Sequence, residues 1–277
     1  MIEGAVKGYT ERGMKVENSP FKQIEIIENV KGGEVFVVNR THENGVEVKG
    51  EEYDQVFNCL GRQSNTQSMG LENIGIMQTS RGGQIKGMNQ GVAELTQNPN
   101  VFAIGDVLHG SGRNNPAAEI GGRRVAAMIS RLLKHPEDSQ NIYADFSEFR
   151  YSHIPLTVFS CPSVSMIGLT QPEAEQMHGK ENIKCITLKR RGMVDDFSGN
   201  KTSQCIYKVI SLKESRRIIG LHYLGDKGEE ILYGLSIAMS HGLTLDNLID
   251  SFTIHPSFSE VFHKNALSNE SYSVESC

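Results

Sequence analysis

The sequence lacks any apolar run long enough to cross a membrane. No stretch approaches the roughly 20 apolar residues that a spanning helix needs, and residues 1–18 are too polar for a secretory signal peptide. Lysine and arginine are dispersed in a chain of net charge -5, so no basic stripe offers a surface to nucleic acid or anionic lipid. We expect a soluble, cytoplasmic protein with no nucleic-acid or membrane partner.

The cysteines lack the spacings of metal sites. The five form no C-x-x-C pair and no zinc-ligand pattern, so we expect no metal. Cys59, Cys161, Cys185 and Cys205 have apolar or strand-like neighbours, which is typical of buried thiols. The final residue, Cys277, lies in a polar tail, and core packing does not explain it.

The length of 277 residues favours two packed units over one. Short apolar runs alternate with turns over 21–49, which predicts a small antiparallel meander. The apolar run Tyr53 to Leu60 predicts a buried strand that stops at Gly61 and Arg62.

The middle of the chain has the order strand, Gly-Asp, loop, helix. Asn100 to Asp106 reads as a buried strand, and Pro116 to His135 has the apolar spacing of an amphipathic helix with proline at its start. This order resembles a nucleotide site at the carboxyl end of a sheet.

A polar, aromatic stretch from Tyr143 to Tyr151 is interpreted as the boundary to a second unit. This unit is predicted to be α+β, with its helices on one face of a sheet. Thr170 and Glu173 form a capping box, and a further helix over 229–241 stops at Gly242. The predicted strands are 155–159, 183–188, 204–210 and 217–223.

A base and an orienting carboxylate stand near the C-terminus. His255 is followed by the rigid Pro256 and, five positions on, by Glu260, a pattern suited to proton transfer with a thiol. Taken alone, the pattern favours an ordinary surface helix with Pro256 in its first turn and Glu260 at the positive end of its dipole.

Five motifs in collinear order give the chain a resemblance to the flavin-dependent pyridine nucleotide-disulfide oxidoreductases. The similarity is nearest to the large thioredoxin reductases, with the glutathione reductases second, because the chain continues past Phe262 to a terminal cysteine and because Ser203 to Cys205 precedes a strand as it does there. The matching segments are Val56–Arg62 with Asn65 and Thr66, Asn98–Asp106, Ile154–Thr170, Ile219–Gly225, and His255 and Pro256 with Glu260.

The resemblance implies a fold class of α/β plus α+β. A truncated, Rossmann-like portion that binds flavin and NAD(P) would precede an α+β dimerisation domain. Residues 1–62 would be a remnant of the NADPH-binding domain and residues 63–148 the C-terminal part of the FAD-binding domain. Residues 149–277 would be the dimerisation domain with a redox tail.

The resemblance also implies contacts to FAD and NADPH. Asp106 would bond the ribityl chain, and the backbone of Asn115, Pro116 and Ala117 would face the isoalloxazine ring, although the family usually has threonine where this chain has Asn115. Gly61 and Arg62 would lie along the nicotinamide cofactor, or Gly61 could simply end a strand.

In such an enzyme His255 would serve a disulfide of the other subunit, which makes a homodimer obligatory. Glu260 would fix the imidazole tautomer, and Pro256 is assigned to the cofactor side of the site. Cys277 would be a tail thiol that passes electrons to thioredoxin or a small disulfide. Its missing partner suggests a selenocysteine codon read as a stop, or a shorter tail.

The family's two G-x-G-x-x-G fingerprints and its C-x4-C disulfide are absent from the sequence. We therefore expect the C-terminal portion of a thioredoxin-disulfide reductase, incomplete as a catalyst. Glutathione-disulfide reductase and a non-catalytic half-subunit that pairs with full-length chains are the alternatives. The choice of NADPH over NADH and a mitochondrial form stay open.

Overall fold

The computed structural model describes residues 6, 9–16, 21–28, 34–41, 47–57, 59, 61–80, 82–87, 92–147, 149–190 and 205–262. They belong to two compact units, one formed by Val6–Arg62 and the other by the residues from Gln63 onward. Each unit is described by itself.

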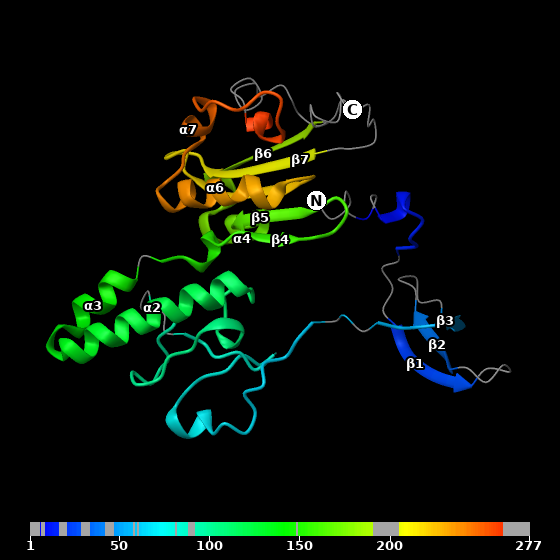
Figure 1. The fold of residues 1–277 in the computed structure, drawn as a ribbon, viewed down its shortest axis with the longest axis horizontal. Coiled ribbons are helices and arrows are strands. Elements are labelled where there is room, and N and C mark those ends of the chain that lie inside the picture. Colours follow the sequence, from blue (N-terminus) through cyan, green and yellow to red (C-terminus); the bar gives the residue numbers. More distant parts are fainter. Residues whose placement is uncertain are drawn as a thin grey trace. The chain divides into compact units, whose positions relative to one another are not determined.

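The first unit contains a three-stranded antiparallel sheet of order β1-β2-β3 (Figure 1). Its strands are β1 (Phe21–Glu28), β2 (Glu34–Thr41) and β3 (Glu47–Tyr53). Pairs such as Ile24 with Val38 set the register between β1 and β2. The predicted meander is confirmed.

The buried strand predicted from Tyr53 to Leu60 is wrong. Tyr53 ends β3, and the described residues after it, 54–57 and 59, form no strand. Phe57 is 80% exposed. An apolar run becomes a buried strand only where neighbouring strands satisfy its backbone groups, and no strand among the described residues pairs with residues 54–57 or 59.

The second unit begins with short 3-10 helices and two packed α-helices. The 3-10 helices η1 (Leu71–Ile74) and η2 (Gly105–Val107) precede α2 (Asn115–Lys134), which η3 (Pro136–Asp138) connects to α3 (Ser139–Phe146). The helix predicted over 116–135 is confirmed as α2.

The segment predicted as a buried strand from Asn100 to Asp106 belongs to no sheet, and its last two residues form the start of η2. Phe102 forms an isolated bridge with Leu95, and the Ala103 N–H donates to the Glu94 carbonyl over 2.9 Å. Both named sheets of the described residues are antiparallel, and the parallel pairing found there is a single bridge. The Rossmann-like portion of the expected fold therefore stays a prediction.

The C-terminal half of the second unit is built on a five-stranded antiparallel sheet of order β4-β5-β8-β7-β6. The strands are β4 (Leu156–Val158), β5 (Val164–Gly168), β6 (Ile183–Arg190), β7 (Cys205–Leu212) and β8 (Ile218–Leu224). The four predicted strands are confirmed. Strand β5 was not predicted from the sequence. It joins the edge strand β4 to the rest of the sheet.

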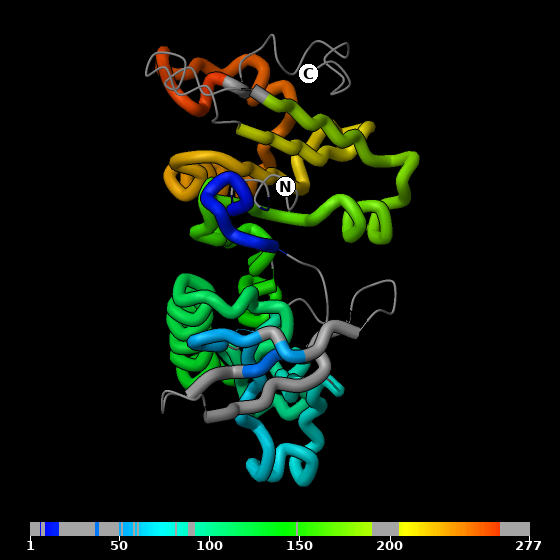
Figure 2. Tube along the Cα trace, turned by 90° about the vertical axis from the view of Figure 1, so that its right-hand side faces the viewer, coloured from blue at the N-terminus to red at the C-terminus, as the bar shows by residue number. Residues whose placement is uncertain are grey.

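Helices cover both faces of this sheet, so the prediction of helices on one face is wrong. Figures 1 and 2 show α6 (Gly228–Ser240) lying along the sheet, and it contacts β4, β5 and β8. The short helix α7 (Leu245–Ile249) packs on the same side. On β7, Val209 faces this side and Ile210 the other, where Ala174 of α4 (Gln171–His178) packs.

The capping box of α4 is confirmed. The Thr170 N–H donates to Glu173 Oε2 over 2.8 Å, and the Thr170 hydroxyl donates to the same oxygen over 2.7 Å. These bonds lower the pKa of the Glu173 carboxyl below its ordinary value.

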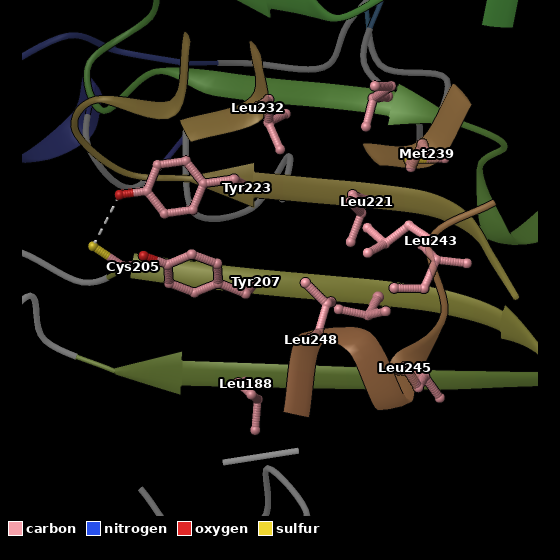
Figure 3. Packing of buried hydrophobic residues seen from close by; sticks show 13 residues of the cluster. Leu188, Cys205, Tyr207, Leu221, Tyr223, Leu232, Met239, Leu243, Leu245 and Leu248 are labelled. Carbon is pink, nitrogen blue, oxygen red and sulfur yellow. Dashed lines mark hydrogen bonds between the residues drawn. The ribbon is translucent and has the colours of Figure 1, made fainter. Parts of the chain in front are cut away.

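The main core lies between the sheet and helices α6 and α7 (Figure 3). Its buried residues are Ile167, Leu188, Cys205, Tyr207, Val209, Ile218, Leu221, Tyr223, Leu232, Met239, Leu243, Leu245 and Leu248.

Of the four cysteines that were predicted to be buried, Cys205 is buried in this core, but Cys161 is half-buried and both Cys59 and Cys185 are exposed. The expectation of four buried thiols therefore holds for Cys205 alone. No helix of the described residues is long and apolar enough to cross a membrane.

Candidate active site

The stretch from His255 to Glu260 brings an imidazole and a carboxylate together. It follows α7 and enters the short 3-10 helix η6 (Phe258–Phe262). His255 Nδ1 lies 2.5 Å from Glu260 Oε1. The imidazole is 64% exposed, whereas the carboxylate is 17% exposed. A sheltered acceptor thus holds one ring nitrogen of an accessible base.

Glu260 is also bonded to the backbone beside it. The Ser257 N–H donates to Glu260 Oε2 over 3.2 Å, and the Ser257 and Ser259 hydroxyl oxygens lie 2.8 Å apart. Pro256 lies before η6, not in its first turn. The surface-helix interpretation is therefore wrong for Pro256 but holds for Glu260, which lies in the first turn of η6 and accepts the N–H of the preceding Ser257. That interpretation does not account for the contact between Glu260 and His255.

The geometry suits general acid-base chemistry. When His255 Nδ1 donates its proton to Glu260, the lone pair of the neutral ring is on Nε2. That atom can accept a proton from a thiol and return it later. The structure brings His255 and Glu260 into contact, and the orienting role of Glu260 stays a prediction.

The Gly-Asp segment folds back against the start of α2. Gly105 has φ +66°, and a Cβ added there would lie 3.4 Å from the Ala118 Cβ, so glycine allows this close approach. Asp106 follows with its side chain exposed. Ser111 was not predicted from the sequence. Its buried hydroxyl donates to the carbonyls of Gly105 over 2.8 Å and Leu108 over 3.0 Å. Its signal is a small polar residue between glycines.

The N-terminus of α2 fits part of a flavin contact. Asn114 caps the helix, because its Oδ1 accepts the Ala117 N–H over 2.8 Å. Pro116 has no N–H, so of the three predicted residues Asn115 has the N–H best placed to meet a ring carbonyl. Ala117 could take part through its N–H only if the cap opened. The positive end of the helix dipole favours an electron-rich ring at this position.

The threonine of the Asn65-Thr66 motif has a structural role. It is buried, and its hydroxyl donates to the Gly83 carbonyl over 2.6 Å. The Ser64 N–H donates to the Gly82 carbonyl over 2.9 Å. These bonds join two segments about twenty residues apart before the Gly-Asp loop begins.

Three predicted site residues are not brought to these groups by the described structure. Gly61, with φ +102°, and Arg62 belong to the first unit, so their position near a nicotinamide stays a prediction. Cys277 lies outside the described residues. Among the described residues, no group of three or more His, Cys, Asp or Glu side chains is arranged to hold a metal ion.

Comparison with known proteins places these observations in one family. Residues 154–266 match the model described as "Pyridine nucleotide-disulphide oxidoreductase, dimerisation domain". A glutathione reductase of Debaryomyces hansenii is 32% identical over 214 residues, which cover 76% of this chain and 40% of that protein. A thioredoxin reductase, SEP1, of Emiliania huxleyi is 30% identical over 213 residues, covering 76% of this chain and 41% of that protein. The chain thus spans about two fifths of the length of these relatives.

Proposed function

Because this chain belongs to the pyridine nucleotide-disulphide oxidoreductases and carries their dimerisation domain over residues 154–266, we propose that it is the C-terminal part of a disulfide reductase that uses FAD and NADPH. The observation that carries the proposal is the pair of His255 and Glu260, with Nδ1 and Oε1 2.5 Å apart and the imidazole side chain 64% exposed.

In this proposal His255 handles the proton of disulfide exchange in a homodimer. When bound, FAD and NADPH would provide the electrons for reduction of a disulfide beside His255. The imidazole would accept the proton of the attacking thiol, stabilise a neighbouring thiolate as a cation, and return the proton to the thiolate that leaves the substrate. Glu260 holds the ring in the tautomer that leaves Nε2 ready to accept.

The proposed cofactor contacts rest on the resemblance to the family, and the fold at the start of α2 supports those to the flavin. Asp106 is exposed beside the first turns of α2 and would accept bonds from ribityl hydroxyls. The Asn115 N–H would meet a flavin carbonyl at the helix N-terminus, with Pro116 and Ala117 packed behind it. Pro256, next to the base, would approach the ring. Gly61 and Arg62 would lie along the nicotinamide.

For the substrate we propose thioredoxin disulfide, because Cys277 provides a thiol in a polar segment beyond the matched dimerisation domain. Glutathione disulfide is the second candidate, and the similarity to the Debaryomyces hansenii glutathione reductase favours it. A tail thiol would be needed to carry electrons out to a protein disulfide, whereas a small disulfide could reach the site itself.

The proposal is tested in a chimera that joins this chain to the N-terminal part of the Debaryomyces hansenii glutathione reductase. We expect His255→Ala to lower NADPH-dependent disulfide reduction by about 10²- to 10⁴-fold, the usual contribution of an acid-base group. Flavin absorbance should be unchanged. The measurement is steady-state turnover with each disulfide.

The matched control is His135→Ala. His135 also pairs with a carboxylate, Glu137, over 3.6 Å, but on the exposed end of α2. Its loss should leave turnover unchanged, and equal turnover of His255→Ala and the unaltered chimera would refute the proposed role. Cys277→Ser separates the substrates: only reduction of thioredoxin should depend on the tail thiol.

A further inference from the structure

The loop that carries His255 and Glu260 needs contacts with the rest of the fold to keep the pair in one position relative to the sheet. The bonds among His255, Ser257 and Glu260 fix these residues relative to one another, but they connect positions no more than five apart. They cannot fix the pair relative to the sheet. A base acts only when it is held in reach of the reacting atom, so the anchor to the rest of the fold matters.

That anchor is at Phe258, two residues before Glu260. Its side chain packs against the core between the sheet and α6 and α7. Its carbonyl accepts a hydrogen bond from the hydroxyl of Tyr207, a residue of β7 fifty-one positions earlier in the chain. The strand therefore bonds the backbone of the loop directly.

Tyr207 is itself held firmly. It is almost fully buried and pairs directly with Tyr223 on the neighbouring strand β8 (Figure 3). The two ring centroids are 4.4 Å apart at an interplanar angle of 46°. Burial raises the pKa of the Tyr207 phenol above its ordinary value, so the hydroxyl stays protonated and remains a donor.

Tyr223 supports this arrangement without touching the loop. Its hydroxyl donates to the Asp226 carbonyl over 2.6 Å and lies 3.4 Å from Cys205 Sγ. A Cβ added at Gly225 would lie 2.5 Å from that hydroxyl oxygen, and one added at Gly228 would lie 2.6 Å from the ring. The turn after β8 thus closes over the ring of Tyr223, which in turn packs against Tyr207.

We propose that Tyr207 is a positioning residue for the base pair: its hydroxyl, through the Phe258 carbonyl, holds the loop at the place and angle in which Glu260 meets His255. The consequence for disulfide reduction rests on the proposed function. The positioning itself does not, because it requires neither cofactor nor substrate.

The test reads the tautomer of His255 by ¹⁵N NMR in this chain, at about pH 8.5, where imidazole is ordinarily neutral. In the unaltered chain we expect the proton on Nδ1, donated to Glu260. In Tyr207→Phe the Phe258 carbonyl loses its donor, and we expect the Nδ1-protonated form to fall to a minor fraction. Replacing Tyr207 with 4-aminophenylalanine, which keeps a donor at the same position, should restore it.

The matched control is Tyr223→Phe. It also removes one buried hydroxyl, which donates to the Asp226 carbonyl and bonds the Tyr207 hydroxyl, but it leaves the bond from Tyr207 to the Phe258 carbonyl in place. We expect it to keep the wild-type tautomer. An unchanged tautomer in Tyr207→Phe, or an equal loss in both variants, overturns the proposal.

If Tyr207→Phe does not fold, the bond from Tyr207 to Phe258 is tested by NMR in the unaltered chain. A bonded, buried hydroxyl exchanges its proton slowly with water, so the Tyr207 hydroxyl proton should be visible and should show a nuclear Overhauser contact to Phe258. Absence of that signal overturns the anchor. Neither NMR readout measures turnover, so the two proposals are tested separately. The role of Tyr207 can be refuted while His255→Ala still abolishes turnover of the chimera, and the role of His255 can be refuted while the bond from Tyr207 to Phe258 is observed.

Discussion

At the scale of single residues, Glu94 shows how a buried charge organises the second unit. It is fully buried, and its Oε1 accepts bonds from Arg124 Nε over 2.8 Å and from the Tyr151 hydroxyl over 2.9 Å. Arg124 also donates to the Phe146 carbonyl over 2.6 Å, and its guanidinium lies 4.3 Å from the Phe149 ring centroid. Burial and the nearby Glu94 raise the pKa of the Tyr151 phenol, which therefore remains a donor.

We expect Glu94→Gln to lower the free energy of unfolding by about 3 kcal/mol, because it removes one charge of a buried, hydrogen-bonded pair and leaves the other. The measurement is urea unfolding. Glu119→Gln is the control: Glu119 pairs with Arg123 on the surface of α2, where the two side chains are 63% and 76% exposed. Such exposed pairs contribute about 0–1 kcal/mol. Equal losses in the two variants would contradict the role of Glu94.

At the scale of elements, two adjacent glycines in α2 have different reasons to be there. A Cβ added at Gly121 would lie 2.7 Å from the Tyr151 hydroxyl oxygen. The nearest atom to a Cβ at Gly122 is Ile104 Cδ1 at 3.9 Å, an ordinary contact. Glycine at 121 lets Tyr151 pass close to the helix on its way to Glu94, although glycine weakens a helix.

We expect Gly121→Ala to destabilise the protein by about 1–3 kcal/mol through overpacking. Gly122→Ala should instead stabilise it by up to about 1 kcal/mol, because alanine is the better helix former. Thermal unfolding of both variants checks this. A gain in stability at both positions would show that Tyr151 moves aside without cost.

At the scale of the whole molecule, α6 is apolar on two sides. Leu232 and Met239 are buried against the sheet, whereas Tyr233 and Ile237, four residues apart on the outer side, are 65% and 50% exposed. A helix that is apolar all round is normally covered on both sides. The match to a dimerisation domain supports a second copy of the chain as the cover.

We expect the double change Tyr233→Glu and Ile237→Glu to weaken self-association by at least about 30-fold, the equivalent of about 2 kcal/mol. Sedimentation over a range of concentrations measures it. Met177→Glu is the control, since Met177 is similarly exposed on α4 over the opposite face of the sheet. Unchanged association of the double variant would exclude this side of α6 from the dimer.

The sequence predicted those elements whose own residues decide them. The apolar period of α2, the capping box of Thr170 and Glu173, and the apolar runs of β7 and β8 are local patterns, and all were found. The run from Tyr53 and the run before Asp106 have strand-like composition, yet neither became a strand of a sheet. Whether an apolar run pairs depends on distant backbone, which the run itself does not encode.

By itself, the sequence determined that an imidazole and a carboxylate stand close enough along the chain to pair. The five-residue step from His255 to Glu260 is short enough for the pair to meet through local backbone alone. Only the tertiary structure decided how that pair is held, because the hydroxyl of Tyr207 reaches Phe258 across fifty-one residues of chain. It likewise joined Glu94 to Arg124 and Tyr151. Contacts of this kind leave no periodicity or spacing in the sequence, since they depend on how strands and helices pack and not on how residues follow one another.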